Sequence, residues 1–264
     1  MKDAVVTLVQ MNHVVGDPEG NLRRMEGAVK EHRDSDIMCF PEMCLSGYTT
    51  EDPVRFALSP DHPCVRRIRS LAKDYSIAIV FGYLEENGRR PFMRQEIADG
   101  TDVPKYYRKT HLGHAESMVF EAGDSLPVFD VEGICIGIQL CVESHIPDLC
   151  QTFRSQGAEL VLTPYSNGVT GKRRKASWHS YMPARASDNG MYVIGCSATG
   201  DNGLGAVFGG GLIAIDPKGN IMDEYYGTDP RSMTVRIGGK LPRDGPETMS
   251  NISYFDRRRP ELYR

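Results

Sequence analysis

Three residues with complementary chemistry each stand close to the end of a stretch that predicts a strand. Glu42 and Lys109 follow two such stretches, and Cys141 ends the β-branched run 133–141. A carboxylate beside a thiol can take its proton, and a nearby ammonium group stabilises both a thiolate and a developing oxyanion. In layered α/β proteins the strand ends build the sites, so the three groups can converge. Together they predict a cysteine nucleophile with its own base.

The sequence around Cys141 favours this chemistry. A polar turn follows the cysteine, and Pro147 opens a predicted helix, where proline suits the first position. A thiol on a corner between strand and helix faces backbone N–H groups, which lower its pKa. The alternative is structural, because free cysteines are usually small apolar core residues. Taken singly, Glu42 and Lys109 would also be ordinary surface charges.

The elements that must position these residues alternate between strands and amphipathic helices. Strands are predicted at 4–9, 37–40, 77–83, 92–98, 103–108, 133–141, 159–163, 191–197, 211–215, 221–226 and 233–237, and near residue 128. Helices are predicted at 21–32, at 64–75, from 147 onward and at 176–188. This alternation is typical of helices packed on a sheet. No linker interrupts the chain, so residues 1–264 are predicted to form a single domain.

Composition argues against several classes of partner. The net charge of -4 disfavours nucleic acid or an anionic membrane surface. No apolar run approaches the ~18–20 residues that span a bilayer, and the N-terminus lacks signal-peptide features. The seven cysteines are an odd number, and Cys39, Cys135 and Cys196 lie within predicted strands. This pattern favours reduced thiols and a cytoplasmic location over a disulfide framework.

Other chemically suggestive residues carry less weight. His111 and His114 could share a metal ion, but no third ligand with suitable spacing follows, so no metal is expected. The basic run 172–175 could grip a polyanion, although a solvated loop is the simpler interpretation. Trp178 either lines a pocket or packs a helix, and the sequence leaves both open.

Longer motifs surround the three reactive residues. They are Pro-Glu-Met at 41–43 with Gly-Tyr at 47–48, Tyr-Arg-Lys-Thr-His-Leu at 107–112, and Leu-Cys-Val-Glu at 140–143 with Pro-Asp at 147–148. These motifs closely resemble those of the nitrilase superfamily of carbon–nitrogen hydrolases, whose members carry a Glu, Lys and Cys triad in this order. Further matches at 120–124, 184–193 and 209–219 extend the resemblance over nearly the whole chain.

The resemblance implies a fold and a set of roles. The expected fold is α/β, a four-layer α-β-β-α sandwich with two mixed β-sheets. Glu42 matches the general base of the family, Lys109 its lysine and Cys141 its nucleophile. Glu116, expected in a loop, matches a second glutamate that positions the substrate. The oxyanion is expected to be held by Lys109 and the backbone N–H of Val142.

The sequence departs from the family pattern beside the expected pocket. Gly113 replaces a common Phe or Pro, and residues 143–146 replace a common Tyr-Asp-x-x-Phe. Val142, Glu143 and His145 are therefore the candidate substrate-binding residues.

The predicted function is hydrolysis of a small-molecule amide through a cysteine thioester, with no cofactor. Nitrilase, N-carbamoyl amide hydrolase and amine acyltransferase activities are alternatives on the same fold, and a non-catalytic binding protein is the alternative outside enzymes. A homodimer or higher homo-oligomer is expected from the family. The apolar content of the C-terminal tail, at Tyr254, Phe255, Leu262 and Tyr263, supports this expectation.

Overall fold

The computed structural model describes residues 1–239, 241 and 253–263. Within them, most strands belong to two six-stranded sheets, and a separate two-stranded sheet lies beside these. The first large sheet contains β1 (Ala4–Gln10), β2 (Ile37–Cys39), β3 (Ala78–Glu85), β4 (Phe92–Ala98), β5 (Lys105–Arg108) and β14 (Arg231–Ile237). The second contains β6 (Val128–Val131), β7 (Ile134–Ile138), β8 (Leu160–Tyr165), β9 (Tyr192–Ser197), β12 (Leu212–Ile215) and β13 (Ile221–Tyr225). The small sheet pairs β10 (Thr199–Asp201) with β11 (Val207–Gly209).

Both large sheets are mixed. The first has the order β14-β1-β2-β3-β4-β5, with β1, β2 and β3 parallel and the remaining neighbours antiparallel. The second has the order β13-β12-β9-β8-β7-β6, with β7, β8 and β9 parallel. The C-terminal strand β14 pairs with β1 along its whole length, from Ala4 opposite Ile237 to Gln10 opposite Arg231. The first sheet is therefore completed by the end of the chain.

The main apolar layer lies between the two sheets, because successive side chains of a strand point to opposite faces. In β2, Ile37 and Cys39 pack in this central layer, while Met38 faces the helices outside. Leu160 of β8 likewise packs inward and Val161 outward. Strands buried on both faces explain why their sequences are nearly continuous apolar runs.

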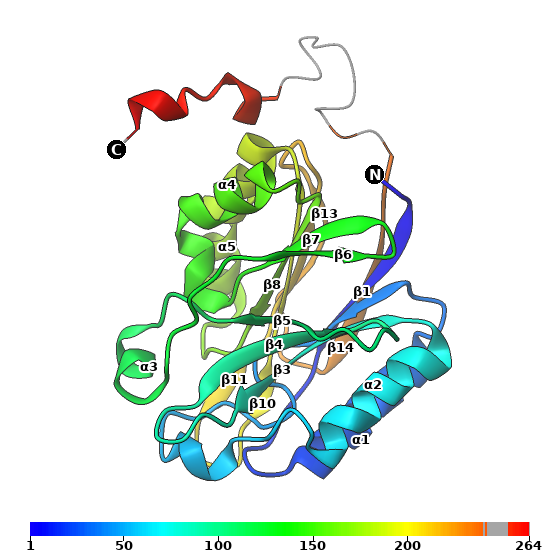
Figure 1. The fold of residues 1–264 in the computed structure, drawn as a ribbon, viewed down its shortest axis with the longest axis vertical. Coiled ribbons are helices and arrows are strands. Elements are labelled where there is room, and N and C mark those ends of the chain that lie inside the picture. The colour runs from blue at the N-terminus through cyan, green and yellow to red at the C-terminus, as the bar shows by residue number, and fades with distance from the viewer. Residues whose placement is uncertain (240, 242–252, 264) are drawn as a thin grey trace.

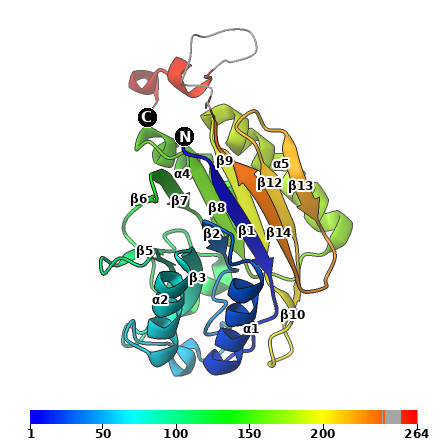
Figure 2. The same ribbon diagram turned by 90° about the vertical axis from the view of Figure 1, so that its right-hand side faces the viewer.

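Helices cover the outer face of each sheet. In Figures 1 and 2, α1 (Pro18–Glu31) and α2 (Pro63–Tyr75) lie on one side of the strands, with α4 (Pro147–Ser155) and α5 (Gly171–Asn189) on the other. Proline occupies the start of α1, α2 and α4, where its missing N–H costs nothing. The four layers confirm the predicted α-β-β-α sandwich of two mixed sheets.

Some elements differ from the sequence-based expectation. Helix α5 begins at Gly171, so the basic run 172–175 forms its first turn and is not a loop. A short helix, α3 (His114–Val119), stands where a loop was expected. The pairing of β10 with β11 was not predicted, since each strand has only three residues and lies in a glycine-rich stretch. Short elements of this kind depend on tertiary contacts more than on periodicity.

The C-terminal segment 253–263 extends beyond the sandwich near α4, as Figure 1 shows. It contains two 3-10 helices, Phe255–Arg257 and Pro260–Leu262. Arg154 of α4 contacts it, with its guanidinium 4.9 Å from the ring of Phe255. In the described part of the chain, no helix combines the length and apolar character needed to cross a membrane.

Candidate active site

Glu42 and Lys109 emerge at the same edge of the first sheet. Glu42 follows β2, and Lys109 is the residue immediately after β5. Strand β4 runs antiparallel to β3, and β5 runs antiparallel to β4, so β5 points in the same direction as β2. The carboxyl ends of these two strands therefore deliver a carboxylate and an ammonium group to one place.

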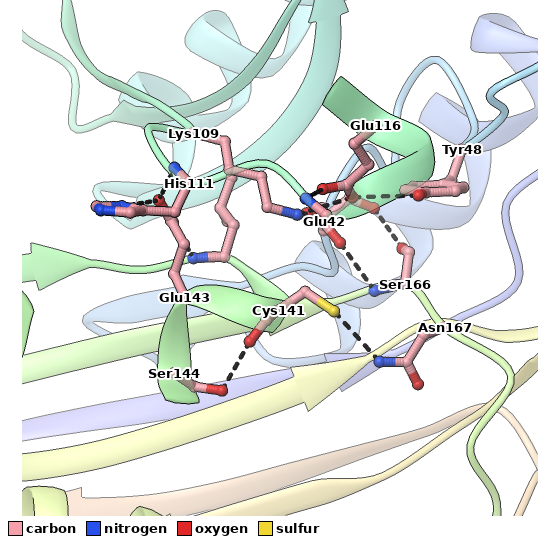
Figure 3. A network of polar contacts seen from close by, with 12 residues as sticks. Glu42, Tyr48, Lys109, His111, Glu116, Cys141, Glu143, Ser144, Ser166 and Asn167 are labelled. Atoms are coloured by element: carbon pink, nitrogen blue, oxygen red, sulfur yellow. Dashed lines mark hydrogen bonds and ion pairs between the residues drawn. The ribbon is translucent and has the colours of Figure 1, made fainter. Parts of the chain in front are cut away.

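Cys141 comes from the second sheet. It follows β7, while Ser166 and Asn167 follow the neighbouring parallel strand β8. The edges of the two sheets meet here, because the backbone N–H of Ser166 donates to Oε2 of Glu42 at 3.1 Å (Figure 3). The site is thus built where the sheets face each other.

Lys109 joins two carboxylates in the interior. Its Nζ lies 2.8 Å from Oε1 of Glu42 and 2.8 Å from Oε1 of Glu116, and its side chain is fully buried. Burial opposes the positive charge, but Glu42, Cys141 and Glu116 outweigh it and hold the pKa of Lys109 above its ordinary value. The amine is therefore a fixed ammonium group. An ammonium group has three N–H donors, and the bonds to Glu42 and Glu116 use two of them.

A salt bridge of Arg108 holds β5, the strand that ends immediately before Lys109. Strand β5 is at the edge of the sheet, next to β4. Arg108 spans β4 and makes a bidentate contact with Glu85 of β3, at 2.7 and 2.8 Å. Such forked pairs fix geometry as well as adding energy. The backbone N–H of Gly123 donates to the carbonyl of Lys109 at 2.8 Å, and a Cβ at Gly123 would overlap the carbonyl oxygen of Arg108.

Glu42 is positioned by a tight turn. Met43, the next residue, has φ of 51°, a left-handed conformation that is uncommon outside glycine. The turn packs against β3 at Gly82, where a Cβ would stand 2.5 Å from the backbone nitrogen of Met43. Ser166 adds a second tie, because its hydroxyl donates to the Glu42 carbonyl at 2.6 Å. His13 lies 3.1 Å from the same hydroxyl.

The environment of Glu42 suits a base that works near neutral pH. Burial raises its pKa to about 7, and the positive charge of Lys109 opposes the rise. With a pKa of about 7, the carboxylate is partly ionised at neutral pH and basic enough to accept a proton.

Cys141 begins a 3-10 helix, Cys141–His145, in a strained conformation. Its φ is 49°, and such angles cost energy for a residue that has a Cβ. Strand β7 ends at Ile138, so the predicted strand that runs to the cysteine is three residues too long. The sulfur accepts a hydrogen bond from Nδ2 of Asn167 at 3.2 Å (Figure 3).

The thiol differs from the expectation in its acidity. Burial and the negative charge of Glu42 raise the pKa of Cys141 to about 11, although Lys109 and Asn167 lower it. The pKa of Cys141 is therefore raised, and not lowered as the sequence had predicted. A carboxylate beside a thiol disfavours the thiolate, so the proton must be passed to Glu42 during the reaction.

Glu116 is held in place by three donors. Its Oε1 accepts from Lys109 and, at 3.1 Å, from the hydroxyl of Tyr48, while its Oε2 accepts from the backbone N–H of Gly113 at 2.6 Å. The short helix α3 carries it, which corrects the predicted loop. Gly113 is the N-cap residue of α3, and the Glu116 carboxylate caps the N-terminus of this helix by accepting from the Gly113 backbone N–H.

Glu143 is a buried link between two segments of the site. Its Oε1 accepts from the backbone N–H groups of Thr110 and His111 at 2.9 Å, and from the Tyr107 hydroxyl at 2.5 Å. Its Oε2 accepts from the Leu140 N–H at 2.7 Å. The carboxylate is fully buried, and its contact with substrate stays a prediction. It positions the segments beside Lys109 and Cys141.

Comparison with known proteins identifies the family. The model of the carbon–nitrogen hydrolase family matches residues 5–237. The chain belongs to the carbon–nitrogen hydrolase family. The predicted family and the predicted enzyme class, a carbon–nitrogen hydrolase, are confirmed by this match.

Relatives of this carbon–nitrogen hydrolase include both amidases and nitrilases. An (R)-stereoselective amidase from Pseudomonas sp. is 27% identical, covering 83% of this chain and 80% of its own. A nitrilase from Pyrococcus abyssi is 26% identical, covering 98% of this chain and 99% of its own. The crystal structure of an amidase from Nesterenkonia sp. has 25% identity, a TM-score of 0.83, and coverage of 98% and 95%.

A variant of an amidase from Nesterenkonia sp. AN1, with a glutamate replaced by glutamine, is 24% identical to this chain and shows covalent addition of the acetamide moiety of fluoroacetamide at its own active-site cysteine.

The remaining candidates of this carbon–nitrogen hydrolase lie in the 3-10 helix that begins at Cys141. Val142 follows Cys141, with its side chain 37% exposed. His145, at the end of the 3-10 helix, is exposed and packs its ring 4.2 Å from Tyr181. Its role in substrate binding stays a prediction. Nδ1 of His111 contacts Thr110, and no cluster of three metal ligands occurs among the described residues.

Several site residues were missed in the sequence. Ser166 and Asn167 follow the predicted strand 159–163, so the rule that selected Glu42 and Lys109 could also have found them. Tyr48 lies in one of the motifs that match the family, but nothing in the sequence predicted its hydrogen bond to Glu116. Trp178 of α5 is buried, and its ring lies 4.9 Å from that of Tyr165 in β8. Of its two predicted roles, the structure therefore supports packing of the helix.

Proposed function

We propose that this protein hydrolyses small-molecule amides through a thioester on Cys141. The observation that carries the proposal is the buried Lys109 that bridges Glu42 and Glu116 at 2.8 Å each, with the sulfur of Cys141 beside Glu42 (Figure 3). A base, a fixed cation and a nucleophile are thus adjacent. Relatives named amidase support the same reaction class.

The proposed first half of the reaction forms the thioester. Glu42 accepts the thiol proton as the sulfur bonds to the amide carbon, and the carbonyl oxygen becomes an oxyanion. The third N–H of Lys109 and the backbone N–H of Val142 hold this oxyanion. The C–N bond then breaks, and the amine or ammonia leaves with the proton from Glu42.

The second half of the proposed reaction regenerates the thiol. Glu42 takes a proton from water as the water attacks the thioester carbon, and the sulfur leaves and recovers a proton. Acid is the second product. Apart from substrate and water, these steps use side-chain and backbone groups of the chain itself.

Glu116 supports an amide substrate over a nitrile. Its carboxylate accepts hydrogen bonds from Lys109, Tyr48 and Gly113, and an oxygen facing the substrate could also accept from an amide N–H. A nitrile has no such donor. Val142 also differs from the Trp that follows the cysteine in typical nitrilases.

Matched amide and nitrile pairs with the same acyl group test this proposal. We expect acid to form from the amides about tenfold faster or more, because a site built for an N–H group penalises a compound that lacks it. Acid and ammonia are measured together, with Cys141→Ala as the blank. Faster acid formation from the nitriles would reverse the assignment.

The alternatives differ in their products. An N-carbamoyl amide hydrolase would release ammonia from carbamoyl compounds, and an acyltransferase would form a new amide when an amine is added. A binding protein would give no turnover. The same assay, with carbamoyl compounds and hydroxylamine included, distinguishes all three.

We also propose that the protein is a homodimer or a higher homo-oligomer. Tyr254, Leu262 and Tyr263 of the C-terminal segment each have more than half of their surface exposed, and exposed aromatic groups favour a partner surface. Light scattering at micromolar concentration is expected to give at least twice the mass of one chain. A monomeric mass would contradict the proposal.

A cytoplasmic location is proposed on the state of the cysteines. Cys39 and Cys196 are thiols that no disulfide joins, although their sulfur atoms lie 3.8 Å apart. Free thiols at this separation support a reducing compartment.

A further inference from the structure

Arg174 is a buried cation without a carboxylate partner. It lies in the first turn of α5 and is 2% exposed. Its guanidinium donates to the carbonyl of Gly210 at 3.1 Å and to the hydroxyl of Ser197 at 3.1 Å. Its plane lies 4.8 Å from the ring of Trp178. Among the described residues, no carboxylate forms an ion pair with it. Buried charges are normally paired, so a group that can become anionic is expected near the Arg174 guanidinium.

The thiol of Cys141, which can become anionic, is one side chain away from Arg174. Nη2 of Arg174 donates to Oδ1 of Asn167 at 2.6 Å, and Nδ2 of Asn167 donates to the sulfur at 3.2 Å. Asn167 therefore connects the guanidinium to the nucleophile, on the side opposite to Glu42 and Lys109 (Figure 3).

The orientation of the Asn167 amide follows from its donors. Oδ1 accepts from Arg174 and also from the backbone N–H of Val169 at 3.2 Å. In the flipped orientation, the NH₂ group would face two donors and the carbonyl would face the sulfur. Arg174 thus fixes the N–H toward Cys141, and its charge polarises the amide, which strengthens that donor.

We propose that Arg174 is a positioning residue that stabilises the thiolate of Cys141 through the side-chain amide of Asn167. This rests on the proposed function, in which Cys141 is the nucleophile. The thiolate forms as Glu42 removes the proton, and it forms again when water releases the acyl group. A donor that binds the thiolate more strongly than the neutral thiol stabilises the negative sulfur in both steps.

The hydrogen bond from Asn167 to Cys141 matters because other groups act on the pKa of the thiol in the opposite direction. Burial and Glu42 raise the pKa of Cys141, and Asn167 is one of the groups that lower it. The competing role for Arg174 is structural, since it ties α5 to Gly210 and Ser197. The two roles predict different results for thiol reactivity.

The test is the pH dependence of alkylation of Cys141 by iodoacetamide in the intact protein, followed by mass analysis of the modified peptide. In Asn167→Leu and in Arg174→Met, we expect the apparent pKa for alkylation to rise by about one, and the rate near neutral pH to fall about tenfold, as for loss of one charge-assisted hydrogen bond. In the double variant, Arg174→Met should add little to Asn167→Leu, because both act on one contact.

The matched control is Lys175→Met. It removes the same charge from the next residue of the helix, where the ammonium pairs with Glu224 and does not contact Asn167. Its alkylation profile should equal that of the wild type. If Arg174→Met fails to fold, Arg174→Gln is measured instead with the same expectation, since it keeps a donor without the charge.

A folded Arg174 variant with a wild-type alkylation profile would overturn the proposal, as would an effect seen only in Asn167→Leu. Both outcomes would leave Arg174 with a structural role. Alkylation needs no substrate, so these results are independent of the proposed function. That function fails separately if the wild-type protein turns over no amide.

Discussion

Replacing Cys141 by alanine is expected to lower kcat by several orders of magnitude and to leave the fold intact. The thioester cannot form without the sulfur, so covalent catalysis is lost outright. Alanine keeps the Cβ and therefore the same strain at φ of 49°, and it removes only the contact to Asn167. Turnover of a good amide substrate and the circular-dichroism melting curve are the two measurements.

Cys135→Ala is the matched control, because Cys135 and Cys141 are the two cysteines that are not fully buried. It should retain most of the wild-type kcat. In the wild-type protein, alkylation of Cys141 alone should track the loss of activity. If Cys141→Ala kept more than a few per cent of wild-type turnover, the thioester mechanism would be wrong.

Replacing Glu42 by glutamine is expected to abolish formation of the thioester. The amide cannot accept the thiol proton, and the pKa of that thiol is already raised to about 11. Loss of the base is worth about 10²–10⁴-fold on its own. The acyl-enzyme is detected as a mass shift after rapid mixing with substrate, and rapid acylation by Glu42→Gln would contradict the assignment.

Glu116→Gln is the matched control for this change, since it alters the other carboxylate on Lys109 in the same way. It should still form the thioester, with a loss of about 10²-fold from misplaced substrate. The two variants separate a base from a group that positions the substrate. Equal losses of acylation in both would leave the base unassigned.

The pH profile gives a second readout of Glu42. The group works as a carboxylate, and its pKa is raised to about 7, so its protonated fraction grows as the pH falls through that value. In the wild type, kcat/KM should therefore decline on the acid side with an apparent pKa of about 7. Residual activity of Glu42→Gln should lack this decline.

The sequence predicted the parts of the site that depend on local order. Glu42, Lys109 and Cys141 follow strands, and the ends of strands that point the same way meet at one edge of a sheet. The alternation of strands and amphipathic helices predicted helices packed on a sheet. The four layers and the two separate sheets were expected only from the resemblance to the nitrilase superfamily.

The features that the sequence did not predict depend on contacts across the chain. Glu143 accepts hydrogen bonds from residues more than thirty positions away, and its local sequence gives no sign of this link. The acidity of Cys141 is set by burial and by Glu42, and a strand-to-helix corner is only one contribution. Arg174 belongs to a basic run, and only packing against Trp178 reveals that it is buried.

The pairing of β14 with β1 has a consequence for how the protein is made. A ribosome produces Glu42, Lys109 and Glu116 first, and Cys141, Ser166 and Asn167 later. Strand β1, at residues 4–10, is made at the start, yet its partner at residues 231–237 emerges near the end. Until then, one edge of the first sheet stays open. A nascent chain that stops before β14 contains the strands β2, β5, β7 and β8 that carry the reactive groups, but it exposes the free edge of β1 to pairing with another chain.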